Sequence, residues 1–189
     1  MEIQDTFIPG LYIVKPAVFE DSRGFFYELF NEKKYSDNGI SARFIQDNIS
    51  FSKKGTIRGL HYQLNPFSQA KLVYVIKGMV LDVVVDLRKN SPTYGKHFSI
   101  ELTEENKLQL FIPRGMAHGF SVLSDEVLFS YKCDNMYNKD SERGINLFDP
   151  LLAIDWKVSA NDAIISPKDS LLPNFNEAEK NFYFPENSL

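Results

Sequence analysis

TIRGLHYQLNPFSQAKLVYVIKGMVLDVVVD, residues 56–86, is the segment of the chain that decides the fold. From Lys71 onward it alternates and is rich in β-branched residues, which predicts two strands, and Lys77-Gly78 is a short turn that would join them as a hairpin. In the second strand Asp82 and Asp86 share one face by the period of two. A buried carboxylate is costly unless it is paired, and the Lys and His of the same segment are natural partners. We therefore expect these charged side chains to face a cavity, with a solvated sheet face as the alternative.

Length and composition predict one mainly β domain that covers residues 1–189. With 43% hydrophobic and 14% aromatic residues, the chain is able to bury a sizeable core. The sixteen Phe and nine Tyr, in mostly short apolar runs, favour many strands over long helices. From about residue 134 onward the chain reads as a loop-rich segment.

Charge and cysteine content narrow the partners and the compartment. The net charge of -4 gives no general attraction to nucleic acid, so any anionic ligand needs a local basic cluster. Cys133 is the single cysteine, and the start MEIQDTFIPG lacks the regions of a signal peptide, so we expect a cytoplasmic protein. No apolar run approaches the roughly 20 residues of a membrane helix, so no membrane association is expected.

The first part of the chain predicts a hairpin or two edge strands, separated by the turn-like residues 20–24. Arg23 precedes the second of these strands and Glu28 follows within it; by themselves both read as surface residues. Asn31 is a possible N-cap for a short helix that ends near Gly39.

Three other positions carry polar groups that the pattern alone leaves open. Gln46 and Asn48 share one face of a predicted strand, with Asp47 on the other, and the amides suit either a base edge or cross-strand pairing. His118 projects from a strand that follows a Pro-Gly turn, and Tyr131 points where the apolar residues of its strand point. By themselves, both are more often structural.

Pieces spread along the chain, in this order, resemble the dTDP-4-dehydrorhamnose 3,5-epimerase family: DSRGFF (21–26), QDN (46–48), RGLHYQ (58–63), QAKLV (69–73), DVVVDLR (82–88), SPTYG (91–95) and PRGMAHGF (113–120). The likeness spans roughly Ile8 to Pro173. It implies a cupin-type double-stranded β-helix, or jelly-roll barrel, with a few short helices. It also implies a homodimer that converts dTDP-4-dehydro-6-deoxy-D-glucose to dTDP-4-dehydro-L-rhamnose in L-rhamnose synthesis.

The same resemblance implies roles for individual residues. His61 would be the general base, Tyr131 the general acid, and Asp169 the partner of His61. The implied substrate contacts are Arg23, Glu28, Gln46, Asp47, Asn48, Arg58, Lys71, His118, Glu142 and Lys168, with Tyr137 stacking on the thymine ring.

The residue types suit this chemistry. Inversion beside a keto group needs a proton acceptor on one side of the ring and a donor on the other, and neutral His and protonated Tyr fit these tasks. A cation such as Lys71 would stabilise the enolate, so Lys71 is a catalytic candidate, and the carbonyl supplies the acidity without a cofactor.

The metal-binding pattern of cupins is altered. The positions that hold ligands in metal cupins are His61, Gln63, Lys71 and His118 here. A cation in place of the carboxylate and an amide in place of a His leave too few ligands, so we predict no metal.

Arg58 and His61 have opposite parity, so a regular strand would send them to opposite faces. Gly59 between them permits a bulge that turns both inward, and regular pairing at 58–61 would count against this hypothesis.

Alternative functions remain at this stage. A relative with the same pocket could epimerise a single carbon or move the ketone of a related sugar nucleotide. A non-catalytic sugar-nucleotide-binding cupin would be expected to lack the acid-base group at His61 or Tyr131, and Gln63 and Lys71 disfavour a metal-dependent oxygenase. A dimer with exchanged N-terminal strands would cover the strand edge around Arg23 to Glu28.

Overall fold

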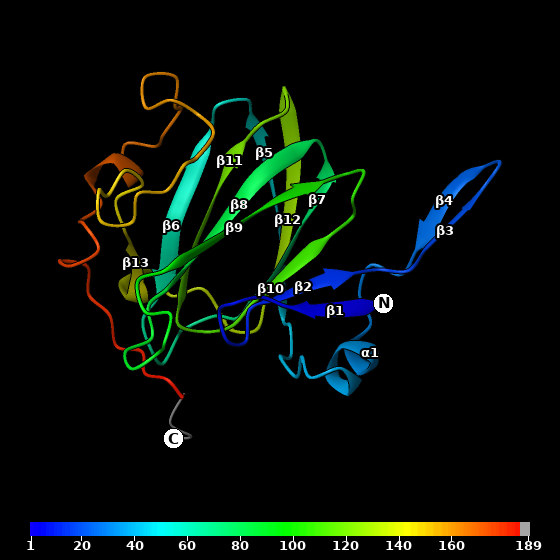
Figure 1. The fold of residues 1–189 in the computed structure, drawn as a ribbon, viewed down its shortest axis with the longest axis horizontal. Coiled ribbons are helices and arrows are strands. Elements are labelled where there is room, and N and C mark those ends of the chain that lie inside the picture. Colours follow the sequence, from blue (N-terminus) through cyan, green and yellow to red (C-terminus); the bar gives the residue numbers. More distant parts are fainter. Residues whose placement is uncertain (186–189) are drawn as a thin grey trace.

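The computed structural model describes residues 1–185, and its elements are mostly strands (Figure 1). Their bounds are β1 Glu2–Asp5, β2 Tyr12–Lys15, β3 Val18–Asp21, β4 Gly24–Tyr27, α1 Glu32–Asp37, β5 Gln46–Lys53, β6 Ile57–Gln63, β7 Lys71–Lys77, β8 Met79–Asp86, β9 His97–Thr103, β10 Gln109–Ile112, β11 Met116–Val122, β12 Glu126–Cys133 and β13 Glu142–Gly144, with the 3-10 turns η1 Lys139–Ser141 and η2 Asp169–Leu171. No helix in the described part of the chain is long and apolar enough to cross a membrane.

Two antiparallel sheets face each other and make the jelly-roll barrel that the resemblance implied. One has the order β1-β2-β10-β7-β12-β5 and the other β13-β6-β11-β8-β9. Between them lies a core of side chains from both sheets, including Val73, Val84, Phe120 and Phe129. The predicted fold class is confirmed.

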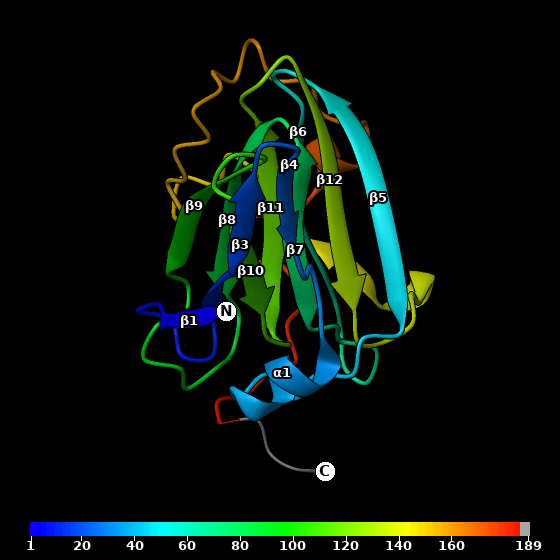
Figure 2. The same ribbon diagram turned by 90° about the vertical axis from the view of Figure 1, so that its right-hand side faces the viewer.

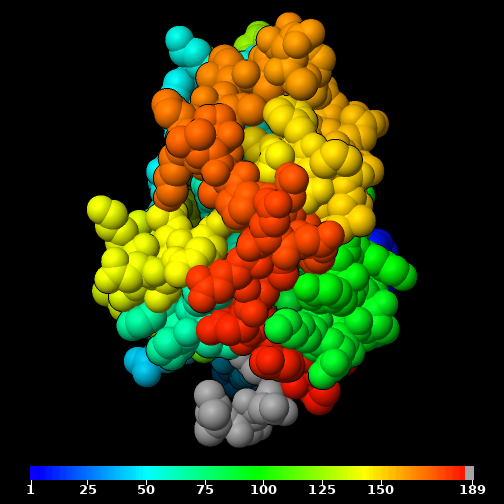
Figure 3. All heavy atoms as spheres, turned by 90° about the vertical axis from the view of Figure 1, so that its left-hand side faces the viewer, coloured from blue at the N-terminus to red at the C-terminus, as the bar shows by residue number. Residues whose placement is uncertain are grey.

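The loop-rich segment after β12 covers the outer face of the second sheet (Figure 3). Its Leu147, Trp156, Phe175 and Phe182 are buried against residues of that sheet such as Val83. Hydrophobic burial on this outer face gives the segment a fixed place despite its scarcity of regular structure.

The predicted hairpin at Lys77-Gly78 is wrong, although both strands exist. β7 belongs to the first sheet and β8 to the second, so the chain turns a corner at Gly78 and changes sheet. Gly78 has φ +87°, and a Cβ there would collide with the carbonyl of Glu126. A glycine corner between apolar strands has the same local pattern as a hairpin turn, but its strands pair with other partners.

The bulge predicted at Gly59 is confirmed by the strand register. On β11, Phe120 pairs with Arg58 and His118 pairs with His61, so β6 carries one more residue than β11 between these pairs. Gly59 has φ +131°, where other residues are strained. The extra residue corrects the parity of Arg58 and His61.

The N-terminal elements match the predictions in part: a hairpin and a short helix form, but β3 extends into the predicted turn and Glu28 lies just after β4 rather than within it. β3 and β4 form a hairpin that projects away from the barrel (Figures 1 and 2). Helix α1 follows, and its N-cap Asn31 accepts a hydrogen bond from the Lys34 amide at 3.1 Å. Gly39, with φ +90°, comes just after the helix.

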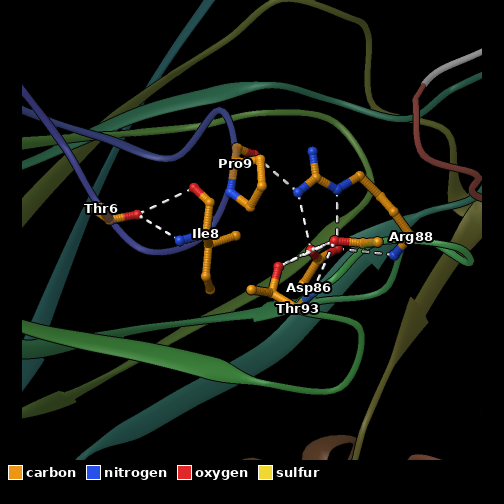
Figure 4. A network of polar contacts seen from close by, with 7 residues as sticks. Thr6, Ile8, Pro9, Asp86, Arg88 and Thr93 are labelled. Atoms are coloured by element: carbon orange, nitrogen blue, oxygen red, sulfur yellow. Dashed lines mark hydrogen bonds and ion pairs between the residues drawn. The ribbon is translucent and has the colours of Figure 1, made fainter.

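Asp82 and Asp86 are both fully buried, so the solvated-face alternative is wrong. Asp86 lies in a polar network with Arg88 and Thr93 (Figure 4), and it also accepts a hydrogen bond from Ser91. Arg88 also donates to the Pro9 carbonyl at 2.9 Å and so ties the N-terminal segment to the end of β8. Burial would raise the pKa of Asp86, but hydrogen bonds from Arg88, Ser91 and Thr93 lower it overall.

Candidate active site

A cavity of about 630 Å³ opens between the two sheets. β5, β7 and β12 contribute one wall, β6 and β11 the other, and residues 164–169 of the C-terminal segment line one side. The predicted site residues among those that line it are Arg58, His61, Lys71, His118, Tyr131, Lys168 and Asp169.

His61 and Asp169 form a dyad at the cavity wall. The bulged strand β6 directs His61 inward, and η2 brings Asp169 to it, with 2.7 Å between His61 Nε2 and Asp169 Oδ1. Burial would raise the pKa of Asp169, but the His61 hydrogen bond and charge, together with the Gly59 amide, lower it. Asp169 therefore stays ionised and orients the imidazole, leaving Nδ1 for a ligand.

His118 forms a second, deeper dyad with Asp82. His118 Nε2 lies 2.8 Å from Asp82 Oδ2, whereas Asp82 Oδ1 has no hydrogen-bond partner among the described residues. Lys71 interacts electrostatically with the same carboxylate. Burial lowers the pKa of Lys71, against the opposing influence of Cys133, Asp82 and Glu142. His118 and Lys71 thus provide two nitrogen donors at this end of the cavity.

Tyr131 reaches the cavity from β12, and its ring lies 5.7 Å from Lys71 Nζ. Burial raises the pKa of its hydroxyl. The group is therefore protonated at neutral pH and is able to donate a proton.

Arg58 lies at another part of the cavity. Its Nε donates to Ser52 Oγ at 3.0 Å, and its Nη2 donates to the Phe51 carbonyl at 3.4 Å. Both partners are neutral, so the guanidinium keeps its charge for an anionic ligand, which Arg binds through forked donors.

Glu142 links Tyr137 to Lys168, and of these three predicted site residues only Lys168 lines the cavity. Its Oε2 accepts from Tyr137 Oη at 2.9 Å and from Lys168 Nζ at 2.5 Å. Burial would raise the pKa of Glu142, but the hydrogen bonds from Lys168 and Tyr137 lower it.

Comparison of the sequence with models of known protein families identifies the family of this chain. The family model described as dTDP-4-dehydrorhamnose 3,5-epimerase matches residues 5–177. The chain belongs to that family. It is thus an isomerase-class enzyme, as the resemblance implied.

Individual relatives of the dTDP-4-dehydrorhamnose 3,5-epimerase family cover nearly the whole chain. The enzyme of Shigella flexneri is 49% identical over 180 residues, which are 95% of this chain and 98% of that protein. The crystal structure from Elizabethkingia anophelis NUHP1 has a TM-score of 0.89 and 52% identity, over 93% of this chain and 97% of that one. The structure from Legionella pneumophila Philadelphia 1, in complex with dTDP-4-keto-L-rhamnose, has a TM-score of 0.92 and 46% identity, over 96% and 98% of the two chains.

The other predicted residues on β5 lie beyond the cavity lining. Gln46 and Asn48 share the face of β5 that carries Ser50 and Ser52 toward the cavity, and Gln46 Nε2 donates to Asn48 Oδ1 at 3.0 Å. Asp47 has the opposite parity and pairs with Lys132 at 2.8 Å.

Arg23 and Glu28 are remote from the cavity of their own chain. Arg23, on the projecting hairpin, pairs with Asp21 at 2.6 Å, and Glu28 pairs with Lys34 at 2.6 Å. The single chain does not bring these two residues to the site.

Other lining residues were not singled out from the sequence. Ser50 and Ser52 continue the alternation of Gln46 and Asn48, so extending the parity along β5 would have found them. Asp82 was expected to need a partner, but its partner His118 lies 36 residues away. Only the fold joins these two.

Residues 1–185 contain no group of three or more His, Cys, Asp or Glu side chains placed to hold a metal ion. The prediction that the enzyme works without a metal stays a prediction.

Proposed function

We propose that this protein inverts carbons 3 and 5 of dTDP-4-dehydro-6-deoxy-D-glucose to give dTDP-4-dehydro-L-rhamnose, in dTDP-L-rhamnose biosynthesis. The observation that carries the proposal is one cavity holding a His61–Asp169 dyad, the protonated Tyr131 and the half-buried amine of Lys71. Family membership supports it, as does the product-like sugar nucleotide in the Legionella pneumophila relative.

In this proposal His61 removes the proton next to the keto group. Asp169 accepts the hydrogen bond from Nε2, so Nδ1 is the nitrogen that receives the proton, and the ionised Asp169 stabilises the resulting imidazolium. The electron pair moves to the keto oxygen. Tyr131 then donates a proton to the carbon from the opposite side of the ring.

Lys71 and His118 would stabilise the enolate oxygen. Both line the cavity, and Lys71 lies beside the Tyr131 ring. A positioned donor to a developing oxyanion contributes about 3 to 4 kcal/mol in other enzymes. Since the substrate carbonyl supplies the acidity, no cofactor is needed.

The nucleotide part would bind toward the rim. Arg58 and Lys168, which line the cavity, would supply cations for the diphosphate, and Tyr137, joined to Lys168 through Glu142, would offer a ring on which thymine stacks. Gln46 and Asn48 provide amide partners, and Glu142 fixes both Tyr137 and Lys168.

We also propose that the enzyme is a homodimer with exchanged N-terminal strands. The β3-β4 hairpin exposes Phe19, Phe25 and Phe26 to solvent, and β5 is an edge strand with the exposed Ile49 and Phe51. A partner's hairpin beside β5 would cover both apolar surfaces and bring its Arg23 and Glu28 to the cavity. Asp47 lies on the face of β5 opposite to Gln46 and Asn48. It would therefore contact the substrate only if dimer formation changed the position of this edge strand.

We place the enzyme in the cytoplasm, as predicted from its single cysteine, with no nucleic-acid partner.

Incubation with dTDP-4-dehydro-6-deoxy-D-glucose in deuterated water tests the function. Two inverted carbons require deuterium at both carbon 3 and carbon 5, and a reductase that accepts only the L-rhamno ketose should consume the product. Deuterium at one carbon would identify a single-carbon epimerase, and no exchange would leave only a binding role.

A further inference from the structure

Gln63 occupies a position that the acid-base chemistry leaves unexplained. It lies two residues after His61 on β6, at a place where metal cupins carry a ligand, and its side chain is only 6% exposed. It lines a small void beneath the main cavity together with Lys71 and His118. A buried amide of this kind needs hydrogen-bond partners for both its donor and its acceptor.

Two of the three backbone partners of Gln63 flank Tyr137 in the chain. Its Nε2 donates to the Met136 carbonyl at 3.1 Å and to the Phe67 carbonyl at 2.7 Å. Its Oε1 accepts from the Asn138 amide at 2.6 Å. The residues before and after Tyr137 are thus held by one side chain from the strand that carries His61.

The ring of Tyr137 is held from a second direction. Its hydroxyl donates to Glu142, whose strand β13 pairs with β6 so that Glu142 lies opposite Gln63. Tyr137 itself is more than half exposed. An exposed aromatic ring with an anchored backbone and hydroxyl is preset for stacking, because little conformational freedom is lost when a base binds.

We propose that Gln63 is a positioning residue for nucleotide recognition: its amide brackets the backbone around Tyr137 and fixes that ring as the platform for the thymine base. This inference rests on the proposed function, since it requires a nucleotide ligand. The bracket needs an amide, because Met136 and Phe67 present acceptors and Asn138 presents a donor. A carboxylate of the same shape would set oxygen against oxygen.

The test measures binding of dTDP and of inorganic diphosphate to full-length variants by calorimetry or by competition. Gln63→Glu should weaken dTDP about tenfold, because the loop must be ordered at the moment of binding. Inorganic diphosphate should bind as in the wild type, since Arg58 and Lys168 are unchanged. Turnover at saturating substrate is compared in Gln63→Met, which adds no charge to the void shared with Lys71 and His118, and it should fall less than dTDP affinity because the stacking contact is alike in ground and transition states.

Two further variants keep the outcome interpretable. Gln63→Met removes the bracket without adding a charge, and should weaken dTDP in the same direction. Adding Gln63→Glu to Tyr137→Ala should cause no further loss of dTDP affinity, because Gln63 acts only through the ring that Tyr137→Ala has already removed.

Gln109→Glu is the matched control. Gln109 is equally buried and bonds the Leu29 carbonyl and the Tyr35 hydroxyl, away from the cavity. It should lower stability and leave dTDP affinity unchanged. Equal dTDP affinity in wild type and both Gln63 variants would overturn the inference, as would a parallel loss of diphosphate binding or of turnover. A wild type that binds no dTDP would instead refute the proposed function.

Discussion

Two histidines face the cavity, and their aspartates come from different parts of the fold. Asp169 reaches His61 from the C-terminal segment, whereas Asp82 lies under His118 within the second sheet. His61 is about one-third exposed, and His118 is buried. The more accessible histidine suits proton abstraction, and the buried one suits oxyanion binding.

His61→Ala and Tyr131→Phe should fail in different ways. Loss of His61 should abolish deuterium exchange at both carbons, because no enolate forms without a positioned acceptor. Loss of the Tyr131 hydroxyl should leave exchange but stop inversion, since His61 still returns a proton to the original face. Mass spectrometry and NMR of recovered sugar nucleotide would separate the two. Wild-type inversion by Tyr131→Phe would remove it as the acid.

Lys71→Met should lower turnover at least about a hundredfold, because a single oxyanion donor contributes roughly that much in other enzymes. Affinity for dTDP should change only a few fold, as dTDP has no enolate oxygen. Steady-state kinetics and calorimetry would measure the two effects. Equal losses in affinity and turnover would make Lys71 a binding residue.

The sequence predicted the charged and acid-base residues of the cavity lining, and Arg58, His61, Lys71 and His118 among them lie in short segments with recognisable neighbours. The partner of Asp82 could not be predicted from the sequence, because β8 and β11 are brought together only by pairing in the sheet. Arg23 and Glu28 were found by resemblance alone, and their own chain keeps them apart from the cavity.

At the scale of elements, the strands were easier to predict than their pairing. The alternation in β7 and β8 fixed their existence and nearly their ends, but a glycine turn between apolar strands does not say whether they pair. The sheet change at Gly78 depends on β10 and β11, which lie later in the chain. The local sequence pattern therefore could not predict that β7 and β8 belong to different sheets.

Gly59→Ala should damage both stability and activity. A Cβ at this position would lie 2.5 Å from the Gly119 Cα and 2.9 Å from the His118 carbonyl, and φ +131° strains any other residue. We expect a loss of about 2 to 4 kcal/mol in unfolding free energy and a larger loss of turnover as Arg58 and His61 shift. Denaturant unfolding and steady-state rates would measure this. Gly24→Ala, at a hairpin position with open space, is the comparison for strain alone.

The Asp86 network should make stability fall in acid. Hydrogen bonds lower the pKa of Asp86 in the folded chain, so its contribution is complete above the unfolded value of about 3.9 and is lost as the pH falls through the folded value. Asp86→Asn should cost about 3 to 5 kcal/mol at neutral pH because it leaves Arg88 buried without its counterion. The variant should also lose less stability than the wild type between neutral pH and pH 3. An equally steep loss in the variant would assign the acid sensitivity to other carboxylates.

At the scale of the molecule, we propose that residues 1–189 act as one domain whose C-terminal segment is part of the site. The segment buries Trp156 and Phe175 on the barrel and delivers Lys168 and Asp169 to the cavity. After β12 the segment contains only the short elements η1, β13 and η2, so sequence patterns predict it only as loop-rich.

The proposed dimer predicts complementation between two inactive variants. If Arg23 acts in the partner's cavity, co-expression of Arg23→Ala with His61→Ala gives mixed dimers in which one of the two cavities is intact. Random assembly makes about half of the dimers mixed, so the mixture should have about a quarter of wild-type activity. Activity assays on the co-purified mixture would measure this, with light scattering to confirm the dimer. Separately purified variants mixed under conditions that prevent exchange should stay inactive. No recovery in true mixed dimers would place Arg23 outside the site, and a monomer at micromolar concentration would remove the strand exchange.

The position of Asp169 in the chain has a consequence for biosynthesis on the ribosome. His61 is made 108 residues before its aspartate, so a nascent chain has all the strands of the barrel while His61, the proposed general base, still lacks its orienting partner. Activity thus appears only after the last quarter of the polypeptide has emerged and wrapped the barrel. A chain cut short by premature termination or proteolysis in that quarter would lack Lys168 and Asp169 at the cavity and would leave the outer face of the second sheet uncovered, so it would lose ligand contacts and stability together.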